Sequence, residues 1–176
     1  ENFPLLLHYH PMVIYRHQVC KQADTVLAML LLPHRFTLAE QRTAFDYYDR
    51  VTTHDSSLSM AAFSAVASLK KGYAYFRETA RLDLDDTHGN TRDGLHMANM
   101  AGAWVCMATG FGGMTVTAQG IAFDPRLPAQ LRGYGFRAAY QGRVIEVRVD
   151  AQGPHYALIS GQPLTICDRG QEITLQ

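Results

Sequence analysis

The sequence predicts a mainly helical protein that ends in a small antiparallel β module. From Val19 to about Gly110 the apolar residues recur at helical spacing, and glycines are few. After the glycine-rich run at residues 110–113, apolar and polar residues alternate, which is the two-residue period of a β-strand. We therefore expect a helical part over residues 1–113 and a β part over residues 114–176.

Within the helical part, each expected helix has an apolar stripe and a start or stop residue. Thr37 and Glu40 form the pair of a capping box ahead of one of them. A short turn, Leu69-Lys70-Lys71-Gly72, is expected to join two others. The expected helices lie near residues 19–32, 38–50, 57–69, 71–80 and 94–109.

The β part contains a strong hairpin pattern. Apolar residues alternate over 136–140, Gln141-Gly142 supplies a turn, and the alternation resumes over 145–149. Glycine, proline or aspartate bounds each of the remaining apolar stretches. Further strands are therefore expected at 119–124, 155–160, 163–167 and 171–175.

Composition excludes several classes of protein. With 47% apolar and 18% charged residues in a chain of 176, disorder and fibrous folds are excluded. Sixteen basic and sixteen acidic side chains cancel, so the chain lacks the basic field that nucleic acid or an anionic membrane surface requires. No apolar run approaches the length of a membrane span. We expect neither partner, and any anion must be bound locally.

The cysteines and the N-terminus bear on the compartment. Cys20, Cys106 and Cys167 are odd in number and far apart, which argues against a disulfide framework and favours the cytoplasm. The first residues have no pattern of a secretion signal. The chain begins at Glu1 rather than methionine, so we expect it to be a fragment of a longer protein.

Two segments suggest a pocket for an oxyanion. The run from Thr53 to Ser59 clusters hydroxyl groups ahead of a predicted helix, and His96 follows Gly94-Leu95 ahead of another. Backbone N–H groups and the dipole at a helix start favour negative charge. The hydroxyls of this run and His96 therefore predict a pocket that a phosphate could occupy. The alternatives are that Ser56 or its neighbour Asp55 caps the helix and that His96 is structural.

A third segment carries a cation and an amide at the start of a predicted helix. Lys21 and Gln22 precede the apolar stripe near 19–32, and such groups grip sugar hydroxyls or phosphate oxygens. A solvated surface turn is the alternative for this pair.

Two groups of residues look like metal ligands, but neither predicts a metal. Alternate histidines on an extended segment serve few metals without further ligands, and acidic loop residues more often cap or solvate a turn. The groups are His8, His10 and His17, and then Asp83, Asp85, Asp86 and His88. We expect no metal.

The order of the motifs resembles glycoside hydrolase family 65 over nearly the whole chain. The matching motifs are Lys21-Gln22-Ala23-Asp24, His54-Asp55-Ser56-Ser57-Leu58-Ser59, Leu82-Asp83-Leu84, Asn90-Thr91 and Gly94-Leu95-His96-Met97-Ala98. The resemblance implies the last part of an (α/α)6 barrel catalytic domain followed by a C-terminal antiparallel β domain. It implies an inverting disaccharide phosphorylase that cleaves an α-glucoside of the maltose, trehalose or kojibiose type and releases β-glucose 1-phosphate.

The resemblance also implies residue roles. Lys21 and Gln22 would contact the glucosyl unit, while Ser56, Ser57 and His96 would hold phosphate. Inorganic phosphate would be a co-substrate, and no cofactor is implied. The general acid of the family is a glutamate ahead of the Lys-Gln motif, and Glu1 lacks its surrounding motif. We therefore expect the acid upstream of this chain, and the isolated chain to be inactive.

Two other functions remain open from the sequence. An inverting α-glucoside hydrolase of the same family would need a carboxylate base, for which Asp55 is the nearest candidate. A noncatalytic fragment that assembles with the missing upstream part is the other. A homodimer is a further expectation from the resemblance.

Overall fold

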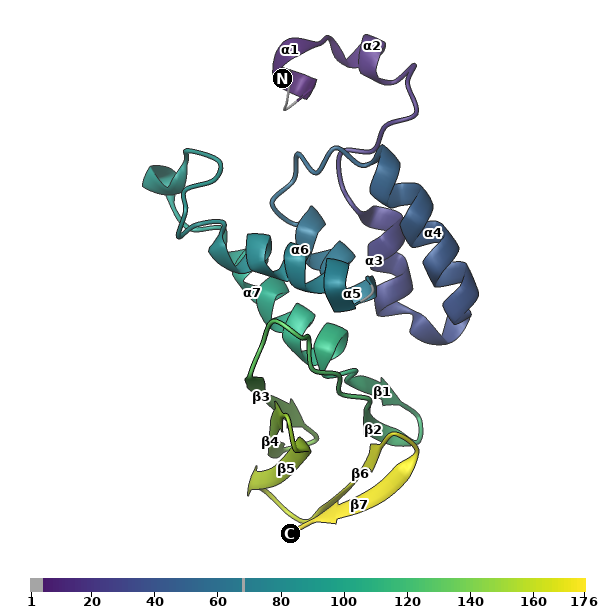
Figure 1. The fold of residues 1–176 in the computed structure, drawn as a ribbon, viewed down its shortest axis with the longest axis vertical. Helices are drawn as coiled ribbons and strands as arrows, with labels where there is room; N and C mark the ends of the chain where they lie inside the picture. Colours follow the sequence, from purple (N-terminus) through teal and green to yellow (C-terminus); the bar gives the residue numbers. More distant parts are fainter. Residues whose placement is uncertain (1–4, 68) are drawn as a thin grey trace. The chain divides into compact units, whose positions relative to one another are not determined.

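The computed structural model describes residues 5–67 and 69–176, and side chains other than those of residues 69 and 70. The chain forms two compact units, Glu1–Ala103 and Trp104–Gln176. Helices fill the first and strands dominate the second, which confirms the predicted helical-then-β order (Figure 1). Strands begin at Thr115, whereas the division into units falls earlier, after Ala103.

The helical unit contains all five expected helices and two short ones that were not expected. The short helices are α1 (Leu5–His8) and α2 (Pro11–Ile14). The expected helices are α3 (Asp24–Leu31), α4 (Leu38–Val51), α5 (Ser59–Val66), α6 (Leu69–Arg81) and α7 (Met97–Val105). Short 3₁₀ turns occupy Pro33–Arg35 and Thr91–Asp93.

Three helix bounds differ from prediction for identifiable reasons. α3 begins at Asp24 rather than near residue 19, because Cys20 pairs its backbone with Val51 and Thr53 instead. The predicted turn at residues 69–72 is wrong, since these residues begin α6 and α5 ends at Val66; Ser68 lies outside the described residues. The last helix starts only after Gly94, whose φ of 132° is incompatible with a helix, and it continues beyond Val105 as a π-helix, Cys106–Phe111.

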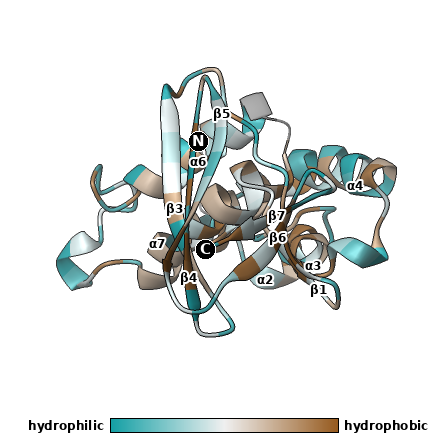
Figure 2. Ribbon diagram, turned by 90° about the horizontal axis from the view of Figure 1, so that it is seen from below, coloured by the Kyte–Doolittle hydropathy of each residue, from teal (hydrophilic) through white to brown (hydrophobic). Residues whose placement is uncertain are grey.

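The capping box at the start of α4 is confirmed. The Thr37 N–H donates to Glu40 Oε2 at 2.7 Å, and the Glu40 N–H donates to Thr37 Oγ1 at 3.2 Å. These bonds satisfy two N–H groups that the first helical turn would otherwise leave unpaired. The bonds that the Thr37 N–H and hydroxyl donate to the Glu40 carboxylate lower the pKa of that carboxyl. Figure 2 shows the alternation of polar and apolar bands along α4 behind this cap.

Replacing Thr37 with alanine is expected to destabilise the first turn of α4 by about 1 kcal/mol, because one reciprocal capping bond is lost. Hydrogen exchange of the peptide over residues 37–44 in the full-length protein should then be about fivefold faster. Thr43→Ala is the matched control, since Thr43 Oγ1 donates only to the Ala39 carbonyl within the same helix. Equal exchange in both variants would contradict the capping role.

α5 is the central helix of the first unit. Five of its eight residues are buried, including Phe63 at 0% exposure. Its buried Ser64 hydroxyl donates to the Gly72 carbonyl at 2.8 Å, which satisfies a polar group inside the core. A helix that is buried around most of its surface packs against neighbours on several sides. Here the core cluster draws on α3, α4 and α5 through Val26, Phe45 and Phe63.

The second unit contains the predicted hairpin. β3 (Gly133–Tyr140) pairs antiparallel with β4 (Arg143–Asp150), and β5 (Gly153–Ser160) adds a third strand. Gln141 and Gly142 both have positive φ, 46° and 76°, as a two-residue hairpin turn of the I′ type requires. The predicted turn is therefore confirmed residue by residue.

A second sheet has the order β1-β2-β6-β7. Its strands are β1 (Thr115–Thr117), β2 (Gly120–Phe123), β6 (Leu164–Asp168) and β7 (Gln171–Leu175). β2 and β6 are parallel, which differs from the wholly antiparallel prediction. The first sheet is inserted between β2 and β6 in the chain, and this long connection allows the parallel pairing. Apolar residues of both sheets, among them Phe123, Ile145 and Ile166, form one core cluster.

Candidate functional site

The segment that carries Lys21 and Gln22 lies beside the segment that leads to the serines. A parallel bridge joins Cys20 to Thr52, with Cys20 N–H donating to the Val51 carbonyl and Thr53 N–H donating to the Cys20 carbonyl, each at 2.8 Å. One segment continues into α3 and the other into α5, and Figure 1 shows both helices descending from this pair. The bridge therefore sets the Lys-Gln motif next to the approach to the Ser-Ser motif.

Lys21 and Gln22 are both exposed. The Gln22 amide donates to Asp24 Oδ1 at 3.1 Å, which holds it at the start of α3. Within the described part of the chain, the Lys21 ammonium has no ion-pair partner. An unpaired ammonium and an amide are the donors that sugar hydroxyls or phosphate oxygens accept from.

Ser56 and Ser57 are partly buried in the turn before α5. The Ser56 hydroxyl accepts from the Leu58 N–H at 3.4 Å, a local bond within the turn. No hydrogen bond of the Ser57 hydroxyl occurs among the residues that the structure covers. The alternative in which Asp55 or Ser56 caps the helix is wrong, because the N-cap is Leu58 and has no side-chain capping bond. Asp55 Oδ2 instead accepts from the Leu5 N–H at 3.2 Å.

His54 anchors the turn that carries Ser56 and Ser57. Its φ of 56° lies in the left-handed region, an unusual conformation for histidine that redirects the chain toward Ser56. Its Nδ1 lies 2.9 Å from the buried Ser59 hydroxyl, and its ring packs against Phe63 at 4.8 Å and Tyr75 at 5.6 Å between centroids. Burial lowers the pKa of His54, so the neutral form is favoured.

A charged group supports this anchor. Asp49, whose side chain is 14% exposed, accepts from Lys71 Nζ at 2.7 Å and from the Tyr75 hydroxyl. Burial acts against the Asp49 carboxylate, but these bonds outweigh it and lower its pKa. Burial and the Asp49 bond raise the pKa of Tyr75. The Tyr75 hydroxyl therefore stays neutral and donates to Asp49, which fixes the Tyr75 ring against His54.

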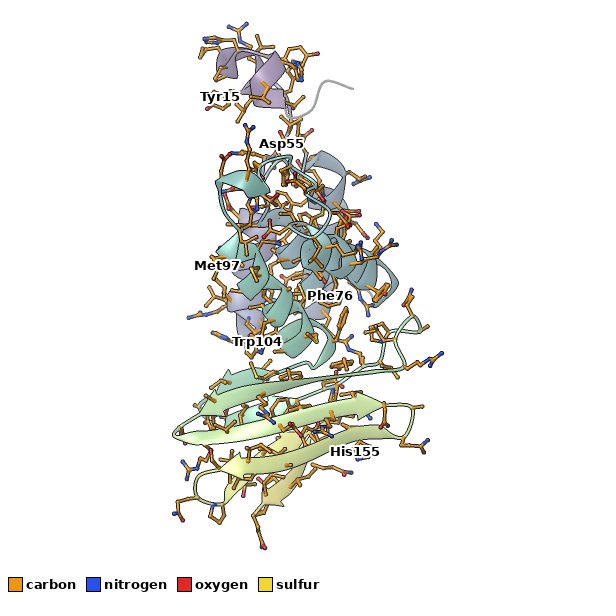
Figure 3. All side chains as sticks on the ribbon, turned by 90° about the vertical axis from the view of Figure 1, so that its left-hand side faces the viewer. Tyr15, Asp55, Phe76, Met97, Trp104 and His155 are labelled. Atoms are coloured by element: carbon orange, nitrogen blue, oxygen red, sulfur yellow. The ribbon has the colours of Figure 1, made fainter. Side chains whose placement is uncertain are left out.

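His96 is held by Asp83. Its backbone N–H donates to Asp83 Oδ2 at 2.9 Å, and its Nδ1 lies 2.6 Å from Asp83 Oδ1. The two side chains are 22% and 12% exposed. The ring of His88 lies 5.8 Å away between centroids. Figure 3 labels Met97 at the start of α7, directly after His96, and Asp55 ahead of α5.

The helices that follow these motifs pack closely. A Cβ placed on Gly102 of α7 would lie 2.7 Å from the Cβ of Ala61 in α5, so glycine permits the contact between the two helices. No hydrogen bond or ring contact among the described residues joins Ser57 directly to His96. The structure thus brings α5 and α7 into contact. Ser57 and His96 would be linked only through a ligand that contacts both.

The acidic loop after α6 has other partners than a metal. Asp85 pairs with Arg81 at 2.5 Å, and Asp86 Oδ1 accepts from the Thr91 N–H at 3.0 Å. Over residues 5–67 and 69–176, no group of three or more histidine, cysteine or acidic residues is placed to hold a metal ion. Cys20, Cys106 and Cys167 form no disulfide among the residues that the structure describes. None of the described helices is both long enough and apolar enough to span a membrane.

Three supporting residues were missed as such from the sequence. From the sequence, Asp83 was assigned to a motif and to the acidic loop. Its bond to His96 was not predicted, because the two residues are 13 positions apart. His54 stood next to the serines, and only its positive φ and its buried contacts identify its role. Gly102 lies within α7, and no pattern in the sequence indicates its contact with Ala61.

The helical unit and the β unit match two models of one family. Residues 1–105 match the glycosyl hydrolase family 65 central catalytic domain, and residues 114–175 match the glycosyl hydrolase family 65 C-terminal domain. The chain therefore belongs to glycosyl hydrolase family 65.

Several of its relatives are named as disaccharide phosphorylases. The α,α-trehalose phosphorylase of Geobacillus stearothermophilus is 52% identical over 94% of this chain and 22% of its own length. The maltose phosphorylase of Bacillus subtilis is 35% identical over 93% of the chain and 22% of its own length. A solved structure of a human-microbiome protein, provisionally named kojibiose phosphorylase, superposes with a TM-score of 0.91 and 29% identity. It is matched over 99% of this chain and 26% of its own. The chain thus spans about a quarter or less of these proteins.

Proposed function

We propose that this chain is the C-terminal portion of an inverting disaccharide phosphorylase, which cleaves an α-glucoside with inorganic phosphate to give β-glucose 1-phosphate and a free sugar. The observation that carries the proposal is the bridge between Cys20 and Thr52. It sets candidate sugar donors on one segment beside the approach to candidate phosphate donors on the other. The names of the relatives support the same activity.

In this proposal, Lys21 and Gln22 contact the glucosyl unit, while Ser56, Ser57 and His96 hold phosphate. Inversion requires the nucleophile on the face opposite the leaving group, aimed at the anomeric carbon. Phosphate takes the place of the water that an inverting hydrolase activates, so no carboxylate base is needed. A glutamate outside this chain would protonate the departing oxygen. Phosphate is a co-substrate, and no further cofactor is proposed.

Residues 1–113 would form the last part of an (α/α)6 barrel, and residues 114–176 would form the C-terminal β domain. The isolated chain would be inactive without the upstream part that supplies the acid. A cytoplasmic location and a homodimer remain predictions.

The hydrolase alternative has less support. Asp55, its nearest candidate base, accepts from the backbone of Leu5, so its carboxylate holds the N-terminal helix in place. A general base must instead reach the attacking water. The noncatalytic alternative would require the full-length protein to lack the acid.

Disaccharide cleavage by the full-length protein, measured with and without inorganic phosphate, tests the proposal. Maltose, trehalose, kojibiose and nigerose are the substrates, and NMR follows glucose 1-phosphate and its anomeric configuration. β-Glucose 1-phosphate that forms only with phosphate is expected. Free glucose released regardless of phosphate would favour the hydrolase, and no turnover of any sugar would favour the noncatalytic protein.

A further inference from the structure

Asp83 contacts His96 at two points. One carboxylate oxygen accepts the backbone N–H at 2.9 Å, and the other lies 2.6 Å from the ring Nδ1. A single side chain thus fixes both the backbone entering α7 and the rotation of the ring. Both side chains are largely shielded from solvent, so water competes little for these bonds.

The contact also decides which ring nitrogen is available to a ligand. A carboxylate only accepts hydrogen bonds, so the hydrogen of this pair lies on Nδ1. The hydrogen bonds from His96 lower the pKa of Asp83, which keeps it in that accepting form. Nε2 is then the nitrogen that faces away from Asp83.

Of Asp83, Asp85 and Asp86 in the loop after α6, Asp83 is the one that contacts His96. Leu82, which directly precedes Asp83, is 5% exposed and anchors this end of the loop. Asp85 and Asp86 bind Arg81 and the Thr91 backbone instead. The three carboxylates of one short loop therefore have separate partners, and Asp83 is the one that reaches the proposed phosphate site.

We propose that Asp83 is the positioning residue of the phosphate site, and that it holds the His96 ring with Nε2 directed at a phosphate oxygen. The inference rests on the proposed function, because it takes His96 as a phosphate ligand. A histidine whose second nitrogen is held by a carboxylate loses little orientational freedom when it binds a ligand.

The test compares Asp83→Asn, His96→Ala and the double variant in the full-length protein. Asparagine has the size of aspartate but only one accepting oxygen, so one of the two bonds is lost. The KM for phosphate is expected to rise about tenfold, with the KM for the disaccharide little changed. The KM for phosphate of the double variant should be no higher than that of His96→Ala alone, because Asp83 acts through the His96 ring.

Asp85→Asn is the matched control, since it removes a charge from the same loop at an exposed ion pair with Arg81. Calorimetry with inorganic phosphate repeats the comparison without turnover. Weaker phosphate binding in His96→Ala but unchanged binding in Asp83→Asn would overturn the inference and leave the phosphate site standing. Losses that add in the double variant would assign Asp83 a general structural role instead. Unchanged binding in His96→Ala would overturn the phosphate site and the inference with it.

Discussion

Replacing His96 with alanine is expected to weaken phosphate use by the full-length protein by about 1–3 kcal/mol, the range for one lost hydrogen bond to a charged group. The ring lies at the start of α7 and is oriented by Asp83, so its removal takes away a pre-positioned ring nitrogen. Ser57→Ala is expected to act in the same direction, because the Ser57 hydroxyl has no partner among the described side chains. The measurement is kcat/KM for phosphate at saturating disaccharide.

His88→Ala is the control for this prediction. Its exposed ring lies 5.8 Å from that of His96, and we assign it no ligand. Its replacement should change kcat/KM by no more than about 0.5 kcal/mol. If both His96→Ala and Ser57→Ala leave phosphorolysis at low phosphate unchanged, the assigned pocket is wrong.

Replacing Phe63 with alanine is expected to destabilise the helical unit by about 3–5 kcal/mol, the usual cost of deleting a fully buried aromatic ring. Phe63 is 0% exposed, and its centroid lies 5.4 Å from Phe45 and 5.8 Å from Tyr75. It also packs on His54, so the cavity would loosen the turn that carries Ser56 and Ser57. The phosphate KM should therefore rise together with the loss of stability.

Hydrogen exchange of the α5 segment, residues 59–66, measures this prediction at increasing urea in the full-length protein. Leu38→Ala, at a position 71% exposed, is the control and should shift stability by less than about 0.5 kcal/mol. A change of less than about 1 kcal/mol for Phe63→Ala would show that its surroundings collapse to fill the space.

Local patterns predicted most of the elements. The capping box at Thr37 and the Gln141-Gly142 turn depend on residues at most three positions apart, and both were confirmed. Helical spacing located five helices and the bounds of α4 to within one residue, but not the starts of α3 and α7. The start of α3 depends on the pairing of Cys20 with a segment 32 positions away. Similarly, the parallel contact of β2 with β6 depends on a strand more than 40 positions away.

The candidate site divides in the same way. Hydroxyls, a histidine, a lysine and an amide at helix starts predicted an oxyanion pocket, and the motif order led to the family. The resemblance then nominated Lys21, Gln22, Ser56, Ser57 and His96. Their roles are still predictions. Sequence spacing did not identify the residues that support them, because the bond from Asp83 to His96 closes a loop and the rings on His54 come from α5 and α6.

Residue type and local spacing therefore suffice for the helical-then-β order, the capped helix, the hairpin turn and the family. The neighbours of the site residues required the folded chain. Local hydrogen bonds and side-chain periodicity act over a few residues, and they leave their pattern in the sequence. The Cys20–Thr52 bridge, the Asp83–His96 pair and the close approach of Gly102 to Ala61 form only in the folded chain, since each joins positions at least 13 residues apart that only the tertiary structure brings together.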